Sequence, residues 1–445
     1  MGVISRIKQK SYLSRNDLVR RIAGGAFWSL TGTATAKLLV LLSGVIVANI
    51  LGKNAYGELG IIRSTINMFV VFAGMGMGLT ASKYISEHRD TDPRKAGSIY
   101  MITNAFAFAT GIIITTIVLL SAPLIADKSL HAGYLTPEIR IGALLLFFST
   151  VNSAQTGVLA GFENFKAIAI NTLIAGATEF VFLSLGAWWL EVKGAIIGSG
   201  ISFFVLWLCN FISIRKCLHR HGIRPNPGSI RKAEFSILWK FSLPATFSSL
   251  LVMPVFWYIK TLLVRDNGFG TMAVYDIADQ WRLIILFIPG ALGQIIVPLL
   301  SNIQGKKDRM DDFWKVLRIN IGINVAITGT LSLLVILFGH YIMRIYGKEF
   351  TETGALVLLS ISCIFTALSN VVGQAIASRA KMWVGFGFNL LWGIIVVTLS
   401  IVFLGKGWGA SGLALAVLLS YVLHTLYQYV YLKISMSKHD LKTIN

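Results

Sequence analysis

The chain has 445 residues, of which 55% are apolar and only 13% are charged. Soluble proteins carry about 25% charged residues, so this composition excludes a soluble enzyme with a polar surface, and the apolar content excludes a disordered chain. A formal net charge of +20 would suggest a nucleic-acid partner in a soluble protein. In a membrane protein the same excess of cations reports which loops face the cytoplasm. The composition therefore predicts a protein embedded in a lipid bilayer.

Twelve long apolar runs follow a basic N-terminal segment, residues 1–21. A membrane-spanning helix needs about 20 mostly apolar residues, because its backbone polar groups must be satisfied within the helix. The first run lacks a small-residue cleavage site, which indicates a retained helix rather than a removed signal peptide. The predicted spans are 22–50, 56–82, 96–122, 139–161, 167–190, 194–214, 236–264, 270–300, 316–343, 354–378, 383–404 and 408–432. We therefore expect an all-α integral membrane protein with twelve transmembrane helices.

The distribution of cations along the chain predicts its orientation. If the N-terminus is cytoplasmic, most of the 40 Lys and Arg residues fall in segments on the cytoplasmic side. The positive-inside rule predicts this asymmetry, so both chain ends are expected in the cytoplasm. The loop at 215–235 is strongly basic, but no recognition motif accompanies it, and we expect no nucleic-acid partner.

The second half of the chain repeats the first. The sequence around Tyr56 and Gly57 recurs around Phe269 and Gly270, and three further short matches follow in order at nearly the same offset. Because each half holds six spans, an even number, both halves enter the membrane in the same orientation. Parallel repeats of this kind are a transporter architecture, with the substrate site between the halves and alternating access by rocking. The predicted parts are six-helix bundles at 22–214 and 236–432, a basic linker at 215–235 and a cytoplasmic tail at 433–445.

Ionisable residues inside the predicted spans are the first candidates for function. Each costs about 2.5–3.5 kcal/mol to insert, so such residues usually face a cavity or a partner. Their concentration in the first two spans of each half predicts a water-filled, net cationic cavity. The candidates are Lys37, Arg63 and Arg282 for binding an anionic substrate, and Asp276, Asp279 and Glu179 for coupling transport to an ion.

The alternative is that these charges neutralise one another in internal pairs, which is the ordinary fate of buried charges. The pairs would then be Asp279 with Arg282, Glu179 with Lys37, and Arg63 with Asp276. Lys260 lies near the end of its span and is expected to extend its amine outward to the membrane surface.

Neutral polar residues extend the predicted polar surface. Amides also hold membrane helices together, so each residue taken alone fits packing better than substrate contact. Gly76 and Pro289 lie at the same depth of the second span in each half and are predicted hinges, with tight helix packing as the alternative. The predicted cavity-lining residues are Asn67, Gln280, Asn152, Asn320, Asn324, Asn370 and Gln374.

No catalytic constellation is visible in the sequence. It has no phosphate-binding loop, no metal-ligand spacing and no nucleophile elbow, and its three cysteines form no redox or zinc pair. We therefore expect a protein that is not an enzyme and that needs no cofactor or metal. The energy for its action is expected from an ion gradient or from the substrate itself.

Two turns carry a resemblance to a known family. Leu51–Gly57 after the first span and Gly157–Phe162 after the fourth, followed by Phe165 and Asn171, resemble the multidrug/oligosaccharidyl-lipid/polysaccharide exporter superfamily. Within it, the chain is most similar to O-antigen-like, polysaccharide-type flippases. The resemblance implies a MATE-like fold in the bacterial cytoplasmic membrane that flips undecaprenyl-diphosphate-linked oligosaccharides for surface polysaccharide biosynthesis. It also implies contact with membrane lipid, a polysaccharide polymerase and a chain-length regulator.

Two other functions remain open at this point. A cation-coupled multidrug or toxin exporter of the same superfamily would need a net acidic cavity. The multidrug branch has a lone acid in span one, whereas this chain has Lys37 there. A membrane enzyme such as a polymerase or ligase would need a large outer loop, and the longest predicted one, about residues 123–138, is short.

Overall fold

The computed structural model describes residues 15–226, 251–291, 310–378 and 382–443. All of the regular elements in these residues are helices. Several predicted segments lie partly outside them. These parts are 1–14 of the basic N-terminal segment, 227–235 of the linker, 236–250 and 292–300 of the seventh and eighth spans, and 444–445 of the tail.

The helices form two sets along the chain. The first set is α2 (Arg15–Gly74), α3 (Met77–His88), α4 (Pro93–Leu124), α5 (Thr136–Gly161) and α6 (Phe165–Arg220), with short turns η1 (Ile125–Ser129) and η2 (Gly133–Leu135). The second set is α9 (Val252–Ile285), α11 (Met310–Leu337), α12 (Gly339–Ile345), α13 (Gly354–Ser378), α14 (Met382–Gly405) and α15 (Gly409–Thr443). Eight helices in the described residues are long and apolar enough to cross a membrane.

Three of the described helices, α2, α6 and α9, are hairpins that join two predicted spans each. In α2 the chain turns at Gly52 (φ 74°, ψ 176°), and in α9 it turns at Gly268 (φ 80°, ψ 173°). This backbone conformation is available to glycine at little cost and strains other residues. In α6 the turn lies at Leu190 and Glu191. With the arms counted separately, the described helices cover parts of all twelve predicted spans, while the number of complete crossings stays a prediction.

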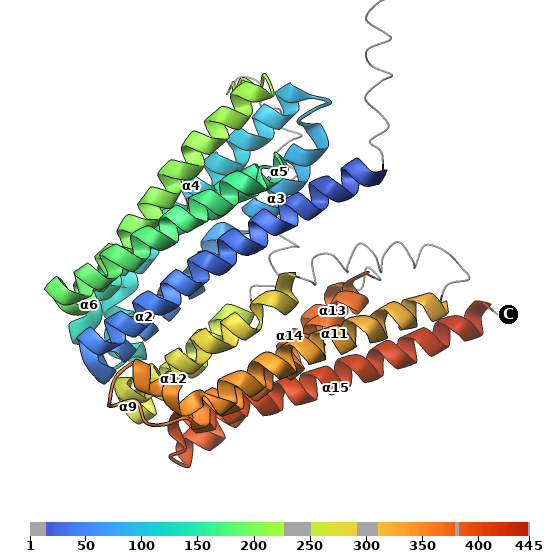
Figure 1. Ribbon diagram of the computed structural model, residues 1–445. Coiled ribbons are helices and arrows are strands. Elements are labelled where there is room, and N and C mark those ends of the chain that lie inside the picture. Colours follow the sequence, from blue (N-terminus) through green and yellow to red (C-terminus); the bar gives the residue numbers. More distant parts are fainter. Residues whose placement is uncertain (1–14, 227–250, 292–309, 379–381, 444–445) are drawn as a thin grey trace, which may run out of the picture.

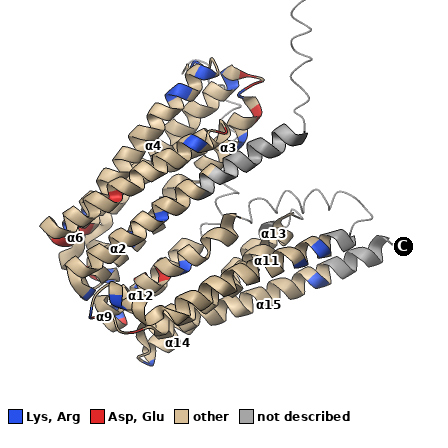
Figure 2. Ribbon diagram, in the orientation of Figure 1, with Lys and Arg blue, Asp and Glu red and all other residues tan. Residues whose placement is uncertain are grey.

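The two sets form separate bundles that meet at one end (Figure 1). The bundles contact each other near the turns of α2 and α9 and separate toward the end that holds the C-terminus and the start of α2. Most of the charged residues lie toward the ends of the helices, with few along their middle (Figure 2). This is the charge distribution that a lipid-embedded bundle requires, because charge in the hydrocarbon region is costly.

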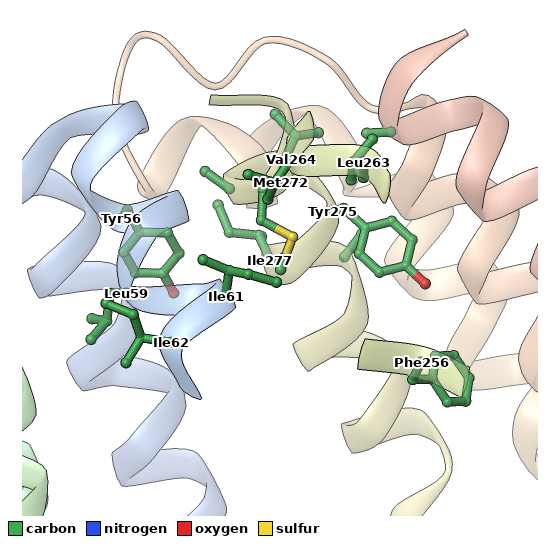
Figure 3. Close-up of a cluster of buried hydrophobic side chains, with 14 of the residues drawn as sticks. Tyr56, Leu59, Ile61, Ile62, Phe256, Leu263, Val264, Met272, Tyr275 and Ile277 are labelled. Atoms are coloured by element: carbon green, nitrogen blue, oxygen red, sulfur yellow. The ribbon is translucent and has the colours of Figure 1, made fainter. Parts of the chain in front are cut away.

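A hydrophobic cluster holds the bundles together where they meet (Figure 3). Ile61 on α2 lies beside Met272 and Ile277 on α9, and all three are fully buried. Gly57 lies so close to the backbone carbonyl of Phe269 that a Cβ atom would not fit between them. The two hairpins therefore touch through main chain as well as side chains.

Both halves interrupt their second span at the predicted hinge depth. In the first half, α2 ends at Gly74, Gly76 has a left-handed backbone (φ 67°), and α3 begins at Met77. In the second half, α9 ends at Ile285, before Pro289. The helix breaks are present, whereas their use as hinges stays a prediction.

Candidate functional site

A cavity of about 370 Å³ lies between the two bundles. Its walls come from α2 and α6 in the first bundle and from α9 in the second, and most of the lining residues are apolar. Three predicted site residues line it, one from each helix: Lys37, Glu179 and Gln280. The structure thus brings together residues that are far apart in the sequence, at the boundary that parallel repeats predict.

Lys37 is the unpaired cation of this cavity. Its side chain is exposed, and its Nζ lies 5.8 Å from the centroid of the Phe287 ring. Among the described residues, no carboxylate lies within ion-pair distance of it, so the alternative pair with Glu179 is not formed. The amine therefore contributes a positive charge that an anionic ligand can use.

Arg63 lines a second cavity of about 200 Å³, which shares Glu179 with the first. Its Nη2 lies 3.4 Å from Oε1 of Glu179 and 3.3 Å from Oγ of Ser199. Asn67, one helical turn further along α2, lines the same cavity. Around the two cavities, two cations therefore face one carboxylate, which leaves a net positive charge.

A compact ion-pair cluster lies in α9, and it differs from the prediction. Arg282 Nε is 2.7 Å from Asp279 Oδ1, and Lys260 Nζ is 2.8 Å from Asp279 Oδ2 and 3.8 Å from Asp276 Oδ1. Arg282 was expected to line the cationic cavity, but it is absent from the lining of both cavities and its side chain is only 7% exposed. The guanidinium instead lies over the Phe256 ring, 4.9 Å from its centroid.

The prediction that Lys260 extends outward is wrong. The turn at Gly268 folds the two arms of α9 together and places Lys260 opposite Asp276 and Asp279, where it is neutralised in the helix interior. A buried charge with two partners is far less costly than an unpaired one. The sequence did contain a signal for this pairing. Lys260 and Asp276 lie the same number of residues before and after the turn glycine Gly268, so a hairpin at that glycine brings them opposite each other.

The shared backbone conformation of Gly52 and Gly268 also revises the register of the repeat. Superposing these two turns places Arg63 at the position equivalent to Asp279, whereas the sequence match of Gly57 with Gly270 makes it equivalent to Asp276, three residues earlier. Equivalent positions of the two halves therefore carry opposite charges.

Hydrogen bonds between the bundles close the end near the two turns. Gln280 Nε2 donates to Tyr56 Oη and to Asp276 Oδ2, both at 2.9 Å, and so connects α2 to the ion-pair cluster. Lys53 Nζ forms an ion pair with Glu352 at 3.1 Å. These inter-bundle contacts were not predicted, because nothing in the sequence indicates which ends of the two halves meet.

The remaining predicted lining residues fall outside the two cavities described above. Asn152 donates to the backbone carbonyl of Phe203 at 2.9 Å, and Asn324 donates to Asn320 Oδ1 at 2.6 Å within α11. The first contact joins α5 to α6, as amides do between membrane helices, and the second lies within a single helix. Asn370 is exposed and Gln374 is half-buried on α13. Among the described residues, no group of three or more His, Cys, Asp or Glu could hold a metal ion.

The two bundles and the cavity between them define a membrane protein of the MATE-like transporter class. A solved structure of a multidrug resistance MATE family transporter of the MOP superfamily, in its inward-facing conformation, matches with a TM-score of 0.81. That match covers 91% of this chain and 95% of the other, at 14% identity. An outward-facing conformation of such a transporter gives a TM-score of 0.68, at 14% identity and 94% and 96% coverage.

The chain belongs to the polysaccharide biosynthesis protein family, which matches residues 22–304. It is 22% identical over 394 residues to the EPS I polysaccharide export inner membrane protein EpsE of Ralstonia nicotianae, covering 87% of this chain and 88% of that one. It is 20% identical over 417 residues to the lipid III flippase of Escherichia coli K12, covering 91% and 96%.

Proposed function

We propose that the protein is a flippase that moves undecaprenyl-diphosphate-linked oligosaccharides across the bacterial cytoplasmic membrane for surface polysaccharide biosynthesis. Its family and the names of its relatives support handling of a polysaccharide or lipid-linked sugar. The observation that carries the proposal is the unpaired amine of Lys37 on the wall of the cavity between the bundles. The cavity-lining cations suit a ligand with an anionic head.

The chemistry of a diphosphate matches these two cations. Lys37 offers a point charge with three rotatable donors, and Arg63 offers a planar fork that binds phosphate oxygens through two hydrogen bonds. Because Arg63 lies 3.4 Å from Glu179 in a partly buried pair that lines the smaller cavity, an entering diphosphate can compete for the guanidinium. The apolar lining of the larger cavity is compatible with the polyprenyl part of such a substrate.

The arrangement of the bundles supports alternating access with this structure as the inward-facing state. The bundles separate toward the chain ends, which the distribution of cations assigns to the cytoplasm. The higher TM-score to the inward-facing than to the outward-facing MATE structure agrees with this assignment. The inter-bundle contacts of Lys53, Tyr56 and Gln280 would then form the outer gate, and the buried acids Asp276 and Asp279 would couple its opening to an ion.

The test is whether cells that lack their own flippase export surface polysaccharide when they carry variants of this protein. Lys37→Ala should abolish export with a normal amount of protein in the membrane, and lipid-linked oligosaccharide should accumulate inside. Lys37→Arg, which keeps the charge, should retain export. Lys128→Ala, at a turn outside the cavities, is the matched control. Full export by Lys37→Ala would contradict the proposal.

A further inference from the structure

Another pocket, of about 370 Å³, lies between the two arms of α6 in the first bundle. Because α6 turns back at Leu190 and Glu191, the first turns of its first arm and the last turns of its second arm lie at the same end of the bundle. All but one of the lining residues belong to α6, and the exception, Asn164, caps its first turn. The pocket shares no residue with the two cavities described above.

Three cations line this pocket, and no carboxylate does. Lys166 comes from the start of the first arm, Lys216 and Arg220 come from the end of the second, and all three are exposed. Among the described residues, none of the three forms an ion pair with an acid. The acid nearest to them in the sequence, Glu163, pairs with Arg89 instead. Three like charges around one pocket repel each other, and a bound anion removes that repulsion.

The positive-inside rule accounts for cations at this end of the molecule, but not for their arrangement around a pocket. Figure 2 shows several Lys and Arg residues at this end of the first bundle. Arg94 and Lys95 at the start of α4 belong to this group, and they lie outside the pocket. The cations of α6 instead meet from two helical arms at one concave site. The first turn of α6 borders the same site, and its free backbone N–H groups add to the positive potential there.

On both arms, a lining cation lies one helical turn outside an exposed isoleucine. Ile170 follows Lys166 by four residues and Ile212 precedes Lys216 by four, so each isoleucine lies about 6 Å deeper in the bundle. Both isoleucines line the pocket, and they are 40% and 45% exposed. The pocket therefore presents positive charge at its outer level and apolar surface below, which is the order of headgroup and acyl chain in a lipid leaflet.

The walls of the pocket are held in place without a ligand. Asn171 Nδ2 donates to Asn210 Oδ1 at 2.9 Å and to Ser213 Oγ at 3.1 Å, and these bonds join the two arms of α6. Lys166 Nζ lies 5.2 Å from the centroid of the Trp28 ring on α2, which holds the amine beside the pocket. A preformed site binds its ligand at a lower cost in conformational entropy.

We propose that this pocket binds the phosphate headgroup of an anionic glycerophospholipid. The lipid comes from the leaflet that the cation distribution assigns to the cytoplasm, where basic pockets between membrane helices suit such headgroups. Arg220 can bind the phosphodiester through two parallel hydrogen bonds, and the two lysines add point charges. The acyl chains lie along Ile170 and Ile212. The lipid is thus a ligand of the first bundle that bridges the arms of α6, separate from the molecule that is transported.

The experiment measures binding of dioleoyl-phosphatidylglycerol to the purified full-length protein in a neutral detergent, by native mass spectrometry. The protein should retain this lipid in preference to dioleoyl-phosphatidylcholine, which has no net charge. Lys216→Gln combined with Arg220→Gln should weaken binding about 25-fold, because each cation near the membrane surface contributes about fivefold. Arg94→Gln combined with Lys95→Gln removes the same charge from the same end of the bundle and should change binding by less than about twofold, since exposed charges outside the pocket are screened.

A charge-conserving variant guards against misfolding. Lys216→Arg combined with Arg220→Lys keeps both charges and should retain the lipid. Equal losses in the two glutamine variants would show attraction to the basic end as a whole and would overturn the pocket. Displacement of the lipid by an equal concentration of inorganic phosphate would show a site for a free anion and would overturn the lipid as its ligand. The assay contains no oligosaccharide, so its outcome is independent of the proposed transport function.

Discussion

The hairpins α2 and α9 have the same backbone turn and opposite chemistry. Gly52 and Gly268 adopt nearly the same dihedral angles, yet α2 presents Lys37 and Arg63 to cavities while α9 encloses its charges in a dry cluster. The two halves therefore share the backbone geometry of this hairpin but differ in how its charged residues are placed. The first bundle presents its cations to the cavities, whereas the second bundle holds its charges in a neutralised network.

The largest effect is expected when the acid at the centre of the α9 ion-pair cluster is removed. Asp279→Ala leaves Lys260 and Arg282 buried near each other, with Asp276 as their remaining nearby acid, and should destabilise the protein by about 3–5 kcal/mol. Thermal unfolding in detergent measures the loss. Arg63→Ala, at the equivalent position of α2, removes a partly exposed group at a cavity wall and should cost about 1 kcal/mol. Equal destabilisation by the two variants would contradict the division between the hairpins.

An intermediate effect, on anion binding, is expected when the carboxylate that pairs with Arg63 of α2 is neutralised. Glu179→Gln frees Arg63 from its carboxylate and should strengthen binding of inorganic pyrophosphate about three- to tenfold, because the net positive charge of the cavities rises. Isothermal titration calorimetry measures this affinity. The control is Glu138→Gln, whose acid pairs with Lys193 outside the two cavities. If Glu179→Gln instead abolishes transport while the cations prove dispensable, a cation exporter would be favoured.

The smallest expected effect concerns the contact between the two halves. The pair of Lys53 with Glu352 is partly exposed and contributes about 0.2–1 kcal/mol, so Lys53→Ala should shift the conformational equilibrium away from the inward-facing state by at most about fivefold. Spin-label distances between Glu87 and Lys315 measure the shift. Lys193→Ala removes an exposed lysine whose ion pair with Glu138 lies within one bundle, and it should leave the equilibrium unchanged. A matching shift in the control would show that the effect is not specific to the inter-bundle contact.

Much of the architecture was predictable because it depends on local pattern. Apolar runs indicated the helices, and the repeated turn indicated two halves with polar residues between them. The glycines of the α2 and α9 turns lie at the ends of predicted spans, where the helices do reverse. The cations Lys37 and Arg63 were recognisable because charge within a span needs either water or a partner.

The partners of individual charges were not predictable, because they depend on how hairpins close in three dimensions. Asp279 pairs with Arg282 as one of the alternatives proposed, but Glu179 takes Arg63 rather than Lys37. Lys260 was predicted to extend outward because it lies near the end of its span. That prediction did not take into account Asp276 and Asp279 on the other arm of the α9 hairpin.

The close approach of Gly57 to the carbonyl of Phe269 has a consequence for how such a protein can diversify. At this point the two bundles touch through backbone atoms, which every residue has, and through Gly57, where no side chain fits. Under the proposed alternating access, substitutions elsewhere along the cavity walls would change the fit to a sugar without displacing this contact between the halves.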